Sequence, residues 1–153
     1  MTASVIALRG EAAEVVLSEA QAVRSMVHDE SRRARLADLI AAAQAGEVSV
    51  DDADALTELL ELGLQTGRIR ALYGPAGEQA ALRLFRKLPQ GVELATSARE
   101  VSEALAALTG RPLDKLEIQA TAPGTYLLSV SVDGRDLTVR LDRQGARLAS
   151  VGI

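Results

Sequence analysis

The sequence predicts an α+β protein, in which an N-terminal region of about four helices precedes a helix packed on a four-stranded antiparallel β-meander. Two features of the 153 residues predict this fold. Apolar residues recur about every 3.6 positions up to residue 110 and at every second position from about 112 onward. Ala (27 residues) and Leu (23 residues) make up a third of the chain, and both favour helices. Pro89-Gln90-Gly91 interrupts the helical pattern, which predicts two regions, 1–90 and 91–153.

A narrow apolar stripe predicts the first helix, over about 11–28. The stripe consists of Val5, Leu8, Ala12, Val16, Val23 and Val27, with Ala20 between them. Its side chains are small and mostly β-branched, so it suits close packing against another helix. Two surfaces fit it: the chain's own helical hairpin at 31–66, or a second copy across a two-fold axis. We expect the second, which makes the stripe the predicted oligomer interface.

Capping signals place the next two helices. Ser31 is the expected N-cap of a helix over about 31–45, and Gly46 stops it. The third helix opens with an acidic turn, where the positive end of the helix dipole favours carboxylates, and it ends at Gly67. The acidic residues of that turn are Asp51, Asp52 and Asp54.

Proline and a capping box place the last two helices. Pro75 suits the first position of a fourth helix that runs to about Leu88. Ser97 and Glu100 have the spacing of a capping box, which predicts the start of a fifth helix over 97–109.

Alternating apolar residues and short turns predict four strands after residue 112, and the helix at 97–109 is expected to cover their apolar face. The order of strands and tight turns in this region, roughly the last 55 residues, resembles that of PepSY-like domains. The residues that carry the resemblance are Tyr126 to Val132, Asp133-Gly134, Val139 to Asp142, and Gly145 to Leu148. The resemblance implies a regulatory or inhibitory binding module, often found outside the cytoplasm. The first ten residues lack the pattern of a signal peptide, so we expect a cytoplasmic location.

Composition excludes several classes of site. The chain has no Cys and one His, which argues against a thiol nucleophile, a multi-histidine metal site and a cysteine-ligated cofactor. We therefore predict no metal and no cofactor. Three aromatic residues are too few for a base-stacking platform, so a nucleic-acid partner is not expected. No apolar run is long enough for a membrane span, so no membrane partner is expected either.

The net charge is −4, but the region 68–99 holds six basic residues against two acidic ones. Arginines, an aromatic residue and the flexible Gly74-Pro75-Ala76-Gly77 stretch converge only here. This is the candidate site for a protein partner or an anion. Its residues are Arg68, Arg70, Tyr73, Arg83 and Arg86. A proline-initiated helix after a turn is the favoured explanation of the Gly-Pro stretch itself.

No catalytic constellation is present in the sequence, so we expect no enzymatic activity. The leading hypothesis is a bacterial interaction protein, either an adaptor or a regulatory module that works by oligomerisation. Its partner would be a protein, with a second copy of the chain favoured. The alternative is a regulator that binds a small ligand or anion in the Arg68–Arg83 region.

Overall fold

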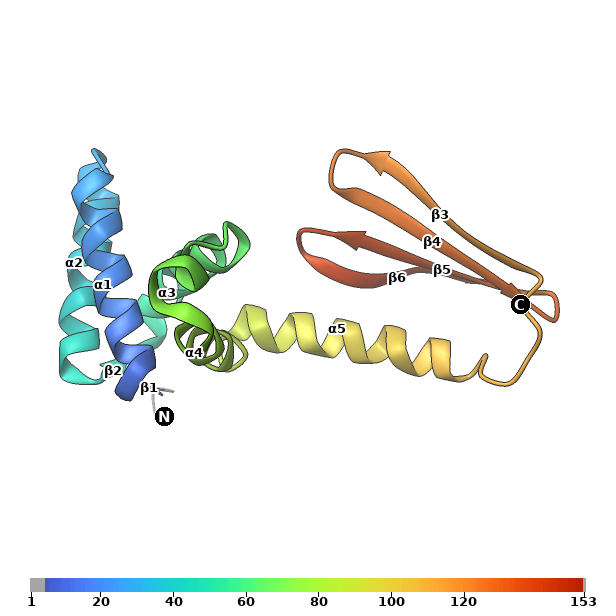
Figure 1. Ribbon diagram of the computed structural model, residues 1–153, viewed down its shortest axis with the longest axis horizontal. Helices are drawn as coiled ribbons and strands as arrows, with labels where there is room; N and C mark the ends of the chain where they lie inside the picture. The colour runs from blue at the N-terminus through green and yellow to red at the C-terminus, as the bar shows by residue number, and fades with distance from the viewer. Residues whose placement is uncertain (1–4, 153) are drawn as a thin grey trace. The chain divides into compact units, whose positions relative to one another are not determined.

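The computed structural model describes residues 5–152 and confirms the α+β class. The chain divides into two compact units, Met1–Gln90 and Gly91–Ile153 (Figure 1). Helices build the N-terminal unit, whereas one helix and an antiparallel sheet build the C-terminal unit.

Four helices and a two-stranded pairing form the N-terminal unit. These elements are β1 (Ile6–Ala7), α1 (Gly10–Met26), α2 (Glu30–Ala45), β2 (Glu47–Val48), α3 (Val50–Gln65) and α4 (Arg68–Phe85). β1 pairs antiparallel with β2, which the sequence analysis did not predict. This pairing joins the chain just before α1 to the loop after α2. The backbone nitrogen of Leu8 also donates to Gly46 O at 2.8 Å, which extends the same connection.

Asp29, rather than Ser31, caps α2. The Asp29 carboxylate accepts hydrogen bonds from the backbone nitrogens of Ser31 and Arg32 at 2.8 and 3.2 Å. The prediction that Ser31 caps α2 was therefore wrong by two residues. The sequence did not separate the two positions, because an Asp and a Ser side chain can both accept hydrogen bonds from the unpaired backbone amides of a helix's first turn. Gly46 ends the helix in the left-handed conformation, with φ of 82°.

A kink at Gly74 divides α4. Its φ of 70° and ψ of −175° interrupt the helix, and Pro75 opens the second part, as predicted. The second part ends at Phe85, short of Leu88. The first part was not predicted as helix. It places Arg68 and Tyr73 on one helical segment, about 1.4 turns apart.

The predicted oligomer stripe lies in the core of the N-terminal unit. Leu8, Val16 and Ala20 are buried there, and Ala12, Val23 and Val27 pack against that core. Val5 is exposed. This is the intramolecular alternative, in which the stripe of α1 packs on the chain's own helices. An interface between copies is thus not formed by these buried side chains.

Helix α5 (Pro89–Ala106) begins eight residues earlier than predicted. Ser97 lies inside this helix, so the capping box at Ser97 and Glu100 does not form a helix start. Pro89 occupies the first helical position, where its missing N–H would have no partner anyway. Pro89-Gln90-Gly91 is therefore the beginning of a helix and not a break in secondary structure.

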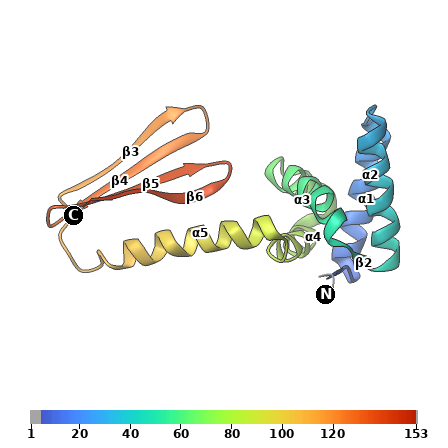
Figure 2. The ribbon, with the colours of Figure 1, turned by 180° about the vertical axis from the view of Figure 1, so that it is seen from behind.

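The C-terminal sheet has the predicted meander topology. Its strands are β3 (Lys115–Ala122), β4 (Thr125–Val132), β5 (Arg135–Asp142) and β6 (Gly145–Gly152), antiparallel in the order β3-β4-β5-β6. Asp133 and Gly134 both have positive φ, 50° and 73°, as a two-residue hairpin turn requires. Helix α5 lies along one face of the sheet (Figure 2). Its Val101 packs against a core formed by β4 and β5.

No helix in the described residues 5–152 is long and apolar enough to cross a membrane.

Candidate functional site

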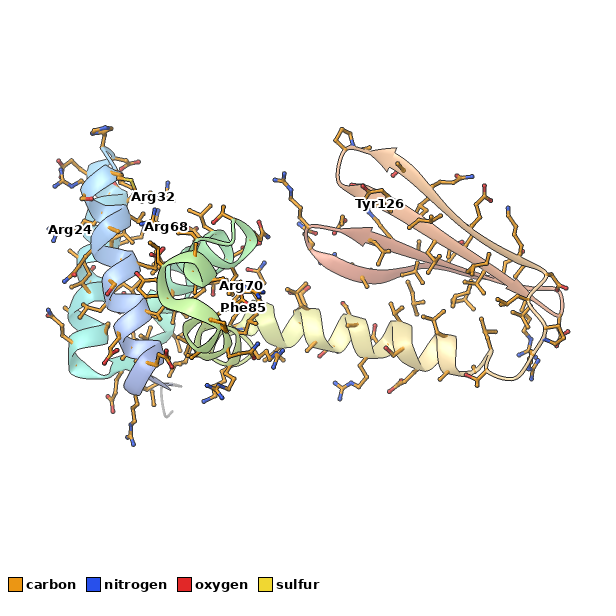
Figure 3. All side chains as sticks on the ribbon, in the orientation of Figure 1. Arg24, Arg32, Arg68, Arg70, Phe85 and Tyr126 are labelled. Atoms are coloured by element: carbon orange, nitrogen blue, oxygen red, sulfur yellow. The ribbon has the colours of Figure 1, made fainter. Side chains whose placement is uncertain are left out.

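The five predicted site residues lie in three separate places. The first place is a cluster around a buried carboxylate on α1, that of Glu19. Glu19 is only 1% exposed. The Arg68 Nε donates to both of its carboxylate oxygens, at 3.2 and 3.1 Å, and the Tyr73 hydroxyl donates to Oε1 at 3.0 Å. Figure 3 labels Arg68 at this cluster. Two of the predicted residues therefore meet, but on a partner that the sequence analysis had not singled out.

The cluster perturbs the tyrosine. Burial raises the pKa of Tyr73 above its usual value of 10.0, and the hydrogen bond and negative charge of Glu19 raise it further. Both causes favour the neutral phenol, which can donate to the carboxylate. The hydroxyl therefore stays a donor well into the alkaline range.

Glu19, Arg68 and Tyr73 join α1 to α4 rather than forming an open site. Each polar atom of the carboxylate already has a partner from the same unit, and a bound ligand would have to displace Arg68. One signal in the sequence marks Glu19. It is three residues after Val16 and four before Val23, so it interrupts the apolar face of its own helix.

Arg70 occupies the second place and contributes little to a site. Its Nη1 lies 3.6 Å from Glu78 Oε1, and its side chain is mostly exposed. Exposed pairs of this kind contribute about 0–1 kcal/mol. Arg70 and Arg68, both labelled in Figure 3, engage different carboxylates although they are two residues apart.

Arg83 and Arg86 occupy the third place, an open groove between the start of α1 and the end of α4. The groove has a volume of about 540 Å³. Its lining residues are Ala7, Arg9, Glu11, Ala12, Ala80, Arg83, Leu84, Arg86 and Lys87. We call it the basic groove. Buried Ala80 and Leu84 form its floor, while the cations are exposed.

Four cations and one carboxylate give the basic groove a formal net charge of +3. None of Arg9, Arg83, Arg86 and Lys87 forms an ion pair with any residue from 5 to 152. Arg9 is also the N-cap residue of α1, where it provides no side-chain cap for the amides of the first turn. The positive end of the helix dipole adds to the field of the side chains. The arrangement can attract and hold an anionic group.

Two of these four cations, Arg83 and Arg86, were predicted from the sequence as site residues. Arg9 was missed because it lies 74 residues before Arg83, and only the packing of α1 against α4 brings them together. The spacing of Arg83, Arg86 and Lys87 at i, i+3 and i+4 was the available signal, since these positions share one side of a helix.

No group of three or more His, Asp or Glu side chains within residues 5–152 is placed to hold a metal ion. Comparisons with protein-family models, curated proteins and solved structures gave no match to this chain.

Proposed function

We propose that this protein is a non-enzymatic interaction module, and that its N-terminal unit binds an acidic and partly apolar segment of a partner protein in the basic groove. The observation that carries the proposal is the combination of an apolar floor with a cationic rim in one groove. Neither the floor nor the rim alone would specify a protein segment.

The cations account for the acidic character of the partner. Arg9, Arg83 and Arg86 present guanidinium groups, which match carboxylates in a bidentate fashion. Like charges gathered at one groove repel one another, and an anionic ligand relieves that repulsion. Glu11 opposes this field only in part, because four cations surround it.

The floor accounts for the apolar character of the partner. Ala12, Ala80 and Leu84 offer carbon surface that a fully hydrated anion would not cover. A groove of about 540 Å³ also falls within the usual range of ligand sites, about 300–1,000 Å³. A peptide that carries both carboxylates and an aliphatic side chain would use the rim and the floor together.

The chemistry of the rim favours binding over catalysis. Guanidinium groups stay protonated at physiological pH and cannot act as general bases. Glu11 is the one carboxylate that lines the groove, and no side-chain hydrogen bond or ion pair within residues 5–152 orients it.

Fluorescence anisotropy with a labelled peptide of alternating Glu and Leu tests the proposal. Arg83→Glu/Arg86→Glu should weaken binding at least about tenfold, a change of about 1.4 kcal/mol. Arg33→Glu is the matched control, since Arg33 is an exposed arginine of the same unit outside the groove. It should bind like the wild type.

Two altered peptides distinguish the partner class. Replacing every Glu by Gln should abolish binding, and replacing every Leu by Ser should weaken it clearly. Equal binding of the Leu and Ser peptides, with competition by inorganic phosphate, would instead support a small-anion regulator. Equal loss in Arg33→Glu would show that binding follows net charge and would refute the assignment to the groove.

A further inference from the structure

One side of the C-terminal sheet carries an apolar strip that α5 does not cover. Leu116 and Ile118 on β3 are 62% and 59% exposed. Tyr126 at the start of β4, labelled in Figure 3, is 44% exposed. Leu116 pairs with Val130, which is only 4% exposed, so the strip continues the face that forms the core.

The geometry of a helix on a sheet explains the strip. A helix with its side chains is about 10–12 Å wide, and neighbouring strands are about 4.8 Å apart. One helix therefore covers about two strands. The core of this unit draws on β4 and β5, while the apolar residues of β3 remain open.

β3 is also a free edge of the sheet. It pairs with β4 on one side, and no other strand of residues 5–152 pairs with it. The residues of β3 from Lys115 to Ala120 pair regularly with β4 and include neither Gly nor Pro, and a register shift follows between Ala120 and Ala122. The opposite edge strand, β6, has a register shift within its length, near Leu148 and Ser150. A regular edge with unpaired backbone groups is a template for another strand.

We infer that this edge binds a second copy of the chain, with β3 pairing antiparallel to β3 of that copy about a two-fold axis at Ile118. In this register Ile118 of one copy lies opposite Ile118 of the other. Across the same axis Leu116 lies opposite Ala120 of the other copy, and Glu117 lies opposite Gln119. Directly opposed residues share one face of a sheet, so the two apolar strips become one.

The charges of β3 are compatible with this register and not with the one centred on Glu117. Moving the axis to Glu117 would place two carboxylates opposite each other, which is destabilising. About Ile118, Glu117 meets the Gln119 amide, a pair that already forms within the strand at 3.0 Å. Charged residues usually protect an edge strand. Here Lys115 is paired with Glu117 at 2.8 Å, and both belong to the face opposite the apolar strip.

The mass of the full chain in solution tests the inference. Light scattering after size exclusion should give a dimer at high micromolar concentration, and Ile118→Lys should give a monomer. Val151→Lys is the matched control, because Val151 lies on the other edge strand and is 66% exposed. It should remain dimeric. A monomeric wild type, or a dimeric Ile118→Lys protein, would overturn the inference.

A cross-link tests the register independently of dimer strength. The chain has no cysteine, so Ile118→Cys creates a single thiol. Side chains directly opposed across antiparallel strands have Cβ atoms about 4.5–5.5 Å apart, close to the separation a disulfide requires. Mild oxidation should convert Ile118→Cys into a covalent dimer much faster than Val151→Cys. Equal rates would contradict the register. Neither experiment involves the basic groove, so failure here leaves the peptide proposal intact.

Discussion

The two units of this protein cover their apolar surfaces to different extents. In the N-terminal unit four helices surround a core of buried side chains that also encloses a carboxylate, Glu19. In the C-terminal unit one helix covers the two central strands, and Leu116 and Ile118 stay exposed. The difference teaches where each unit can meet a partner. The first offers a charged groove on a closed core, and the second offers apolar surface that its own chain leaves open.

Removing a core side chain should have the largest effect and should test whether the two cores are independent. Leu60 is fully buried in the N-terminal core, so Leu60→Ala should destabilise that unit by about 2–5 kcal/mol. Hydrogen exchange should show faster amide exchange in α1 to α4 and unchanged exchange in β4 and β5. Leu62→Ala, on the same helix but exposed, is the control and should change little. Equal acceleration in both units would mean that they unfold as one.

An intermediate effect should come from the hydroxyl that binds the buried carboxylate. Tyr73→Phe removes one hydrogen bond to a charged group, which should destabilise the N-terminal unit by about 1.5–3 kcal/mol near neutral pH. Urea unfolding followed by circular dichroism would measure it. Tyr126→Phe, at the exposed strip of the C-terminal unit, should have almost no effect on that unfolding transition.

The same tyrosine predicts a dependence on alkaline pH. The pKa of Tyr73 is raised in the folded protein, so its contribution is fully present below the ordinary tyrosine value of 10.0. It is lost as the pH rises from there through the folded pKa, because the unfolded chain releases the proton first. The stability difference between wild type and Tyr73→Phe should therefore shrink above pH 10.0. A difference that is constant with pH would be inconsistent with this hydrogen bond.

The smallest effect should come from the cap of α2. Asp29→Ala removes the acceptor of two backbone amides and should destabilise the N-terminal unit by about 0.5–2 kcal/mol. Ser31→Ala should be nearly neutral, because its side chain is exposed and does not cap the helix. The thermal midpoints of the two variants, measured side by side, would check the assignment. A larger loss in Ser31→Ala than in Asp29→Ala would identify Ser31 as the cap instead.

Sequence reasoning was most successful where the structure depends on neighbours along the chain. The period-2 pattern after residue 112 and the Asp133-Gly134 turn predicted the meander, because hairpin pairing and turn conformation are local. Local rules were also ambiguous where two signals competed. Pro89 and Ser97 are both good helix starts, and the helix begins at the first although Gly91, Val92 and Thr96 between them are weak helix formers.

The sequence by itself determined the fold class, the order of the four strands of the C-terminal sheet after the helices, and the side of that sheet that α5 covers. Only the tertiary structure decided what lies against the α1 stripe, which carboxylate Arg68 and Tyr73 share, and how Arg9 joins Arg83 in one groove. The physical reason is sequence separation. Periodicity and capping act over a few residues, whereas Glu19 and Arg68 are 49 residues apart and meet only when α1 packs against α4.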